Sequence, residues 1–74
     1  MAMDERKALN IEFDFATKTA TVVFPADHQF VVADVVAYFE DATHGEVMVI
    51  RIFHDDTLAQ ELRRPFPGND HART

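Results

Sequence analysis

The run of residues 54–56, His-Asp-Asp, is the part of this chain that most resembles a metal site. Zinc sites commonly space the two ligands of a pair two to five residues apart, as in His-x₃-His. Here the ligand types are adjacent, and the other histidines lie far away in the sequence, at His28, His44 and His71. We therefore expect no metal and no other cofactor. We expect a polar turn in which Asp55 or Asp56 supports the start of a helix, because carboxylates interact favourably with the helix dipole there.

Residue types that usually carry catalysis are scarce. The chain has no serine and no cysteine, and its threonines lack a recognisable partner base. The acidic pairs at 40–41 and 55–56 are adjacent residues, which face different ways on a helix or a strand, so neither pair is typical of general acid–base catalysis. The two glycines, Gly45 and Gly68, form no phosphate-binding loop. We predict that the protein is not an enzyme.

Composition bounds the class of protein. The chain has 74 residues, of which 47% are hydrophobic, which suits one small folded domain. The lack of cysteine excludes disulfides and thiolate metal sites. No apolar run approaches the roughly 18 residues of a membrane span, and residues 1–9 lack the apolar stretch of a signal peptide. We expect a protein of the reducing cytoplasm with no membrane partner.

The first half of the domain is predicted to begin with a β-hairpin. Apolar and polar residues alternate over residues 9–16, a pattern typical of a strand with one apolar face. Thr17-Lys18 suits a turn, and the β-branched and aromatic segment 19–24 is expected to pair back onto the first strand. Pro25 ends that second strand. Residues 29–32 are expected to add a third short strand, the alternative being an extended approach to a helix.

An amphipathic helix is predicted over residues 35–43. Asp34 is expected to be its N-cap, and His44-Gly45 its end, because glycine accepts the left-handed cap conformation. At about 100° per residue, the helix has one apolar face, one polar face and two flanks. The apolar face holds Val35, Val36, Phe39 and Ala42. The opposite face holds Asp34, Ala37 and Asp41, with Tyr38 and Glu40 on the flanks.

A strand apolar on both faces is predicted over residues 46–53. One face holds Met48, Ile50 and Ile52, and the other holds Val47, Val49 and Phe53, interrupted by Arg51. Thr57 and Gln60 then have the spacing of a capping box, which predicts a short helix over residues 58–64 that Pro65 ends.

The resulting order, β-β-(β)-α-β-α, predicts an α+β domain. We expect a small, mostly antiparallel sheet of three to four strands, one main helix on one face, and the short C-terminal helix. The domain is expected to span residues 8–66. A flexible lead is expected over residues 1–7 and a flexible tail over residues 67–74, after the Pro-Phe-Pro-Gly breaker.

One helix covers only one face of such a sheet. The second face, with Val47, Val49 and Phe53, would form an apolar patch that soluble monomers rarely expose. A second copy of the chain is one cover, and these three residues are then the predicted oligomer interface of a homodimer. A different protein is another. In the simplest alternative, the terminal helix and Phe66 fold over the sheet and close the core of a monomer.

The net charge of −6 belongs to the middle of the chain. Residues 8–50 hold seven acidic residues and one lysine, and residues 27–46 hold five acidic residues and no base. Such a surface favours basic partners and disfavours nucleic acid and anionic membranes. The alternative is a helix face made acidic for solubility. The predicted partner-binding residues are Asp34, Tyr38, Glu40 and Asp41, with Asp27 and Glu46 at the rim.

Three functions are open at this point. The first is a non-enzymatic protein-interaction module, an inhibitor or adaptor that docks its acidic helix face on a basic surface of a larger protein. In size, acidity, α+β pattern and lack of catalytic motifs, the chain is similar in general character to phage-encoded inhibitors such as anti-CRISPR proteins. The alternative is an assembly subunit that works through a sheet-mediated homo-oligomer. The third is a small enzyme or metal-binding protein that uses His54, Asp55 and Asp56.

Overall fold

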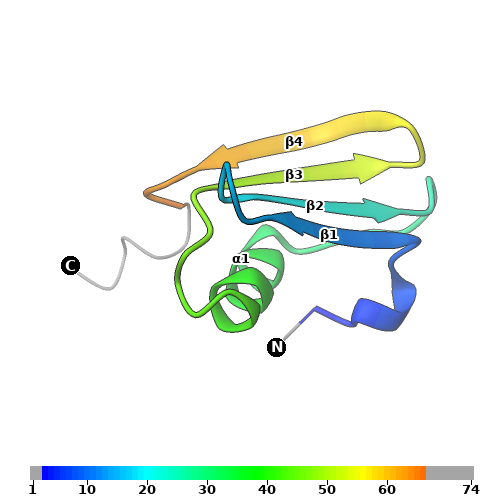
Figure 1. Cartoon of the computed structure of the whole chain (residues 1–74). Helices are drawn as coiled ribbons and strands as arrows, with labels where there is room; N and C mark the ends of the chain where they lie inside the picture. The colour runs from blue at the N-terminus through cyan, green and yellow to red at the C-terminus, as the bar shows by residue number, and fades with distance from the viewer. Residues whose placement is uncertain (1–2, 67–74) are drawn as a thin grey trace.

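The structure is a computed structural model, and it describes residues 3–66. One helix packs on a four-stranded mixed sheet, so the fold is α+β (Figure 1). In chain order the elements are η1 (a 3-10 helix, Glu5–Lys7), β1 (Asn10–Asp14), β2 (Thr19–Phe24), α1 (Val32–Ala42), β3 (Val49–His54) and β4 (Thr57–Arg63).

The sheet has the strand order β1-β2-β3-β4. β1 and β2 form the predicted antiparallel hairpin, with Asn10 opposite Val23 and Asp14 opposite Thr19. Its turn is held by the Asp14 carboxylate, which accepts hydrogen bonds from the backbone N–H groups of Ala16 (2.9 Å) and Thr17 (3.3 Å). β3 and β4 form a second antiparallel hairpin. The sheet is mixed, and not mostly antiparallel as predicted, because the central strands β2 and β3 run parallel.

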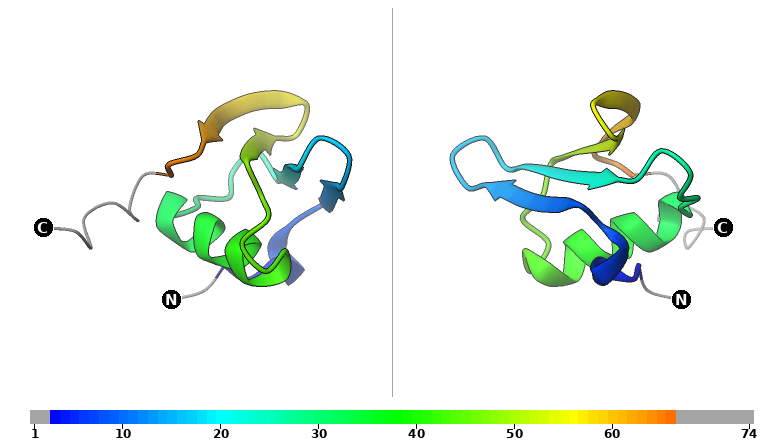
Figure 2. Two further views of the ribbon diagram at one scale, coloured as in Figure 1. Left: turned by 60° about the vertical axis from the view of Figure 1, so that its left-hand side comes forward. Right: turned by 90° about the vertical axis from the view of Figure 1, so that its right-hand side faces the viewer.

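α1 connects these two parallel strands and lies along one face of the sheet (Figure 2). Parallel neighbours need a long crossover, and a helix is the usual one because it satisfies its own backbone. Three side chains of α1 are buried against the sheet, namely Val35, Val36 and Phe39, as the apolar periodicity predicted. The fourth predicted member, Ala42, is exposed.

The start of α1 differs from the sequence prediction. Residues 29–32 do not form a third short strand: the chain from 28 to 31 is irregular, and the helix starts at Val32. Val31 is the N-cap, with no side-chain hydrogen bond, so Asp34 lies inside the first turn and not at the cap. A carboxylate in the first turn still interacts favourably with the positive end of the helix dipole. At the other end α1 stops at Ala42 with Thr43 as the C-cap, and the left-handed conformation begins at His44 (φ +55°), one residue before Gly45 (φ +79°), which was predicted to supply it.

The prediction of a C-terminal helix over residues 58–64 is wrong, because strand β4 (Thr57–Arg63) occupies this segment up to Arg63. Asp55, with a left-handed φ of +53°, makes the tight turn that brings the chain back along β3. β4 then pairs with β3 from His54 opposite Thr57 to Val49 opposite Arg63, with a bulge near Ile52 and Phe53. Pairing with β3 satisfies the backbone hydrogen bonds of this segment, which the capping-box spacing alone had predicted to be helical.

The core lies between α1 and the inner face of the sheet. Its largest members are Phe24, Phe39 and Phe66, each at most 1% exposed. Phe66 lies in this core, whereas one sequence-based alternative expected it to fold over the second face of the sheet together with a terminal helix; residues 3–66 contain no such helix. In the segment expected as a flexible lead, residues 1–7, the structure has the 3-10 turn η1 and a buried Met3. The predicted tail, residues 67–74, lies outside the described residues.

Arg64, which follows the end of β4, forms hydrogen bonds with the segment that follows α1. Its guanidinium donates hydrogen bonds to the carbonyl oxygen of Val47 (2.7 and 3.1 Å) and, more weakly, to that of Gly45 (3.3 Å). It also pairs with the Glu40 carboxylate at 3.0 Å and lies over the ring of Phe66, 4.8 Å from its centroid. The planar guanidinium presents five N–H donors in a fixed fork, whereas an ammonium group is a compact charge with three donors.

We predict that Arg64→Lys lowers the free energy of unfolding by about 1–2 kcal/mol, because it keeps the charge but loses the forked hydrogen bonds. The measurement is urea denaturation followed by circular dichroism. Arg63→Lys is the matched control, since Arg63 is exposed and, within residues 3–66, its one ion pair is with Glu61, at 2.8 Å; it should change stability by less than about 0.5 kcal/mol. Equal losses for the two variants would contradict the role given to Arg64.

Candidate interaction surface

The outer side of α1 carries three of the predicted partner-binding residues together. Asp34, Tyr38 and Asp41 are four and three residues apart, so they lie on one side of the helix, turned away from buried Val36. Asp41 is exposed, and Asp34 and Tyr38 are half-buried. We call these three residues the acidic helix face.

Glu40 and Glu46 do not join this face. Glu40 lies on the other flank of α1 and pairs with Arg64 at 3.0 Å. Glu46 follows the helix and pairs with Lys18 at 2.6 Å. The hydrogen bond from Lys18 holds the pKa of Glu46 below its ordinary value. Each of these acidic side chains therefore has a nearby cation that offsets its charge, whereas Asp27 is exposed in the loop between β2 and α1.

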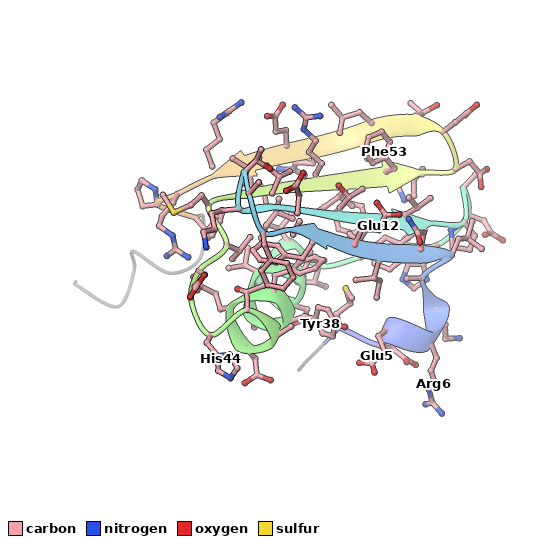
Figure 3. The ribbon with its side chains drawn as sticks, in the orientation of Figure 1. Glu5, Arg6, Glu12, Tyr38, His44 and Phe53 are labelled. Atoms are coloured by element: carbon pink, nitrogen blue, oxygen red, sulfur yellow. The ribbon has the colours of Figure 1, made fainter. Side chains whose placement is uncertain are left out.

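Tyr38 lies at the edge of the acidic helix face, between α1 and η1 (Figure 3). Its ring packs edge-on against Phe39, with centroids 5.1 Å apart, and contacts the core. Burial raises the pKa of its phenol, and the negative charge of Glu5 on η1 raises it further. The phenol is thus kept as a neutral hydrogen-bond donor beside two aspartates.

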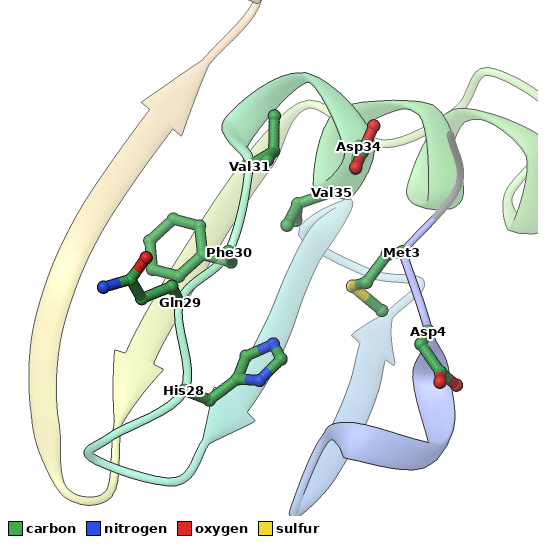
Figure 4. A pocket seen from close by; sticks show the side chains of 8 residues that line it. All are labelled: Met3, Asp4, His28, Gln29, Phe30, Val31, Asp34 and Val35. Atoms are coloured by element: carbon green, nitrogen blue, oxygen red, sulfur yellow. The ribbon is translucent and has the colours of Figure 1, made fainter.

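A small hollow of about 160 Å³ opens at the start of α1 (Figure 4). Asp34 and Val35 come from α1, residues 28–31 come from the segment that leads into it, and Met3 and Asp4 come from the N-terminal segment. The lining combines apolar side chains with two carboxylates. The backbone N–H of Arg6 donates to the Asp4 carboxylate and lowers its pKa, which keeps that group ionised. This chemistry suits an aliphatic chain that ends in a positive charge.

The face of the sheet opposite α1 has no helix over it within residues 3–66 (Figure 2). The pairing of the four strands arranges its side chains in three rows across the sheet. From β1 to β4 these rows are Asn10, Val23, Phe53 and Leu58; Glu12, Thr21, Arg51 and Glu61; and Asp14, Thr19, Val49 and Arg63. Only the first row is mainly apolar. We call this surface the open sheet face.

The predicted oligomer residues do not all lie on the open sheet face. Val49 and Phe53 do, and both are half-buried. Val47 is fully buried, and Met48, which was assigned to the core side, is 47% exposed. The predicted alternation is wrong at these two residues because β3 begins only at Val49. Before it, Val47 is held inward by a hydrogen bond from its N–H to the Thr43 hydroxyl (3.1 Å) and by Arg64.

A shallow polar hollow of about 370 Å³ lies on the open sheet face. Its lining includes the carboxylates of Glu12 and Asp14 on β1 and the guanidinium of Arg51 on β3. Arg51 is 3.9 Å from the Glu61 carboxylate, which also pairs with Arg63 at 2.8 Å. No site was predicted on β1 from its sequence. The signal that would have identified one is the alternation itself, since it puts both acids of β1 on one side of the strand.

The His-Asp-Asp run at residues 54–56 lies at the end of β3 and in the turn to β4, where His54 makes structural contacts. The Nε2 atom of His54 is 2.8 Å from the carbonyl oxygen of His28, and its ring contacts Phe30. Asp55 and Asp56 are exposed at the turn between β3 and β4. In the part of the chain that the structure describes, no group of three or more histidine, aspartate or glutamate side chains is arranged to hold a metal ion. The same residues include no helix with the length and apolarity that a membrane crossing requires.

Comparison with known proteins gives no match to any family model, curated protein or solved structure.

We predict that Tyr38 ionises above the ordinary value of about 10, because both causes of its pKa shift favour the neutral phenol. Tyr38 is the only tyrosine and tryptophan is absent, so absorbance at 295 nm follows it alone. Since the unfolded chain ionises first, stability should fall as the pH rises above 10. Glu5→Gln should lower the midpoint slightly, and urea should return it to the ordinary value. A native midpoint at or below the urea value would contradict the burial of Tyr38.

Proposed function

We propose that the chain is a non-enzymatic protein-interaction module, an inhibitor or adaptor, which docks the acidic helix face on a basic surface of a larger protein. The observation that carries the proposal is the position of Asp34, Tyr38 and Asp41 on one side of α1, in a stretch of sequence (27–46) with no lysine or arginine. Electrostatic complementarity of this kind speeds association and selects partners by charge.

The six predicted contact residues fall into two groups, according to whether Arg64 or Lys18 pairs with them. Asp34, Tyr38 and Asp41 form the centre of the proposed contact, with Asp27 at its rim. Glu40 and Glu46 are expected to contribute less, because Arg64 and Lys18 already offset their charges. Tyrosine is common at the centre of protein interfaces, since it buries a large ring and keeps a polar end.

The hollow at the start of α1 gives the proposed contact a specific feature. A lysine or arginine side chain of the partner would lay its methylene groups along Phe30 and Val31 and bring its charge to the carboxylates of Asp34 and Asp4, although Asp4 already pairs with the Arg6 guanidinium at 3.3 Å. Val31 is 60% exposed, so apolar surface is available beside the acids. The partner's basic surface is therefore proposed to include at least one such side chain that projects into the hollow.

The experiment is affinity capture from an extract of the native host, with quantification of the captured proteins by mass spectrometry. We predict that Asp41→Lys reduces capture of the specific partner about tenfold, and that salt does the same. Asp41→Lys suits the fold, because a cation near the end of a helix is favourable. Asp56→Lys is the matched control, an equal charge change at an exposed turn. Equal capture by the two variants would overturn the proposal.

A second function is favoured by one row of the open sheet face. Val23, Phe53 and Leu58 are neighbours across three strands, and Leu58 is 46% exposed. An assembly subunit would cover this row with a second copy of the chain. Asp14 at one edge of the face and Arg63 at the other are then charges of opposite sign that a two-fold axis parallel to the strands brings together.

This second function predicts that the wild-type chain has the mass of two chains in light scattering, and that Phe53→Lys has the mass of one. Thr57→Lys, an exposed residue at the turn end of β4, is the control and should keep the wild-type mass. A wild-type chain with the mass of one copy at high concentration would exclude the assembly function.

A further inference from the structure

We propose that the outer edge of β1 binds an extended segment of the partner, which joins the sheet as a fifth strand and alternates apolar with basic residues. The inference rests on the proposed function, because it takes the partner to be a basic protein. It adds the backbone conformation of the docking segment and the residue pattern that β1 selects.

The position of β1 in the sheet makes this edge available. β1 is the first strand of the order β1-β2-β3-β4, so β2 occupies one side of it and no strand within residues 3–66 occupies the other. The backbone N–H and C=O groups along such an edge are a template for strand addition. η1 lies near one end of β1 and not along it (Figure 1).

The opposite edge, β4, is a poorer template. Its pairing with β3 shifts near Ile52 and Phe53, and a bulge of this kind twists an edge and interrupts regular pairing. The register of β1 runs without a break over five residue pairs, from Asn10 to Asp14.

The helix side of β1 selects apolar residues. Ile11 and Phe13 lie opposite the buried residues Val22 and Ala20, and both are half-buried. Leu9 and Phe15, which flank the strand with the same period of two, are 61% and 74% exposed. The Phe15 ring packs edge-on against Phe13, with centroids 4.9 Å apart. A fifth strand with apolar side chains on this side would cover these exposed groups, with Tyr38 beneath β1 as in Figure 3.

The other side of β1 selects basic residues. Glu12 and Asp14 point to the open sheet face, where β2 presents Thr21 and Thr19 opposite them. The nearest base in that row, Arg51, is one strand further away and lies close to Glu61. Side chains of the fifth strand on this side would be direct neighbours of Glu12 and Asp14, and opposite charges at such positions stabilise a strand pair.

The same charges argue against a second copy as the fifth strand. Two copies of β1 paired antiparallel through their outer edges would bring Glu12 and Asp14 next to the carboxylates of the other copy. Like charges at neighbouring positions destabilise a strand pair. We therefore infer that the fifth strand is a segment of the partner with lysine or arginine at every second residue.

The test uses the full chain labelled with ¹⁵N and a synthetic peptide of alternating lysine and valine, KVKVKVKVK with blocked ends. We expect amide shifts concentrated at residues 9–15. Glu12→Lys should weaken binding about tenfold, and Phe15→Ala several-fold. Asp56→Lys, with the same charge change far from β1, is the matched control and should bind as the wild type does. A peptide of equal composition in blocks, VVVVKKKKK, should leave β1 unshifted.

Several outcomes would overturn the inference: no shift at residues 9–15, equal binding of the block peptide, or equal binding of an EVEVEVEVE peptide. Shifts confined to β4 would show that the peptide adds to the opposite edge of the sheet. A molecular mass that rises with protein concentration and is lowered by substitutions on β1 would show that a second copy of the chain binds the β1 edge. The proposed function has a separate readout. If the alternating peptide leaves β1 unchanged while Asp41→Lys still reduces capture of the partner about tenfold, the inference of strand addition is wrong and the proposed docking through the acidic helix face is retained.

Discussion

The parallel pairing of β2 and β3 is the constraint on which the rest of this molecule depends. Two parallel neighbours require a crossover, and here residues 25–48 provide it, with α1 as its central part. A single crossover helix covers one face of a sheet. The inner face therefore holds the buried core around Phe24 and Phe39, whereas the open sheet face and the two edge strands are left for solvent or for another molecule.

This constraint also separates the charges. The inner side of α1 must be apolar to bury Val35, Val36 and Phe39, so only its outer side is free to carry acids. Where the chain folds back on itself, cations meet the acids: Lys18 pairs with Glu46, and Arg64 pairs with Glu40. Asp34 and Asp41 consequently lie together on the outer side of α1, and two further acids, Glu12 and Asp14, lie on β1. Both proposals use the surfaces that the crossover leaves uncovered.

The sequence predicted the elements whose signals are periodic and missed those decided by contacts between distant residues. The hairpin follows from alternation over residues 9–16 and from the β-branched and aromatic residues of 19–24, the apolar side of α1 from helical spacing, and most of β3 from the apolar run over residues 46–53. β4 was predicted as a helix because its capping spacing is a local signal, and pairing with β3 overrides it. Likewise, no spacing in the sequence indicates that Arg64 reaches the Glu40 carboxylate, 24 positions away. Nor does it indicate that the Arg64 guanidinium donates to the carbonyl oxygen of Val47. The acidic stretch was visible in the sequence, but the pairing of Glu46 with Lys18 and of Glu40 with Arg64 was not.

Native-state hydrogen exchange, followed amide by amide in the free chain, measures whether the centre of the sheet is covered and its β1 edge is open. A sheet with a covered centre and open edges predicts the slowest exchange in β2 and β3, at rates set by global unfolding, and fast exchange for the outward-facing amides of β1. Slow exchange throughout β1 in a monomeric sample would show that another part of the chain already covers this edge, which would contradict the account.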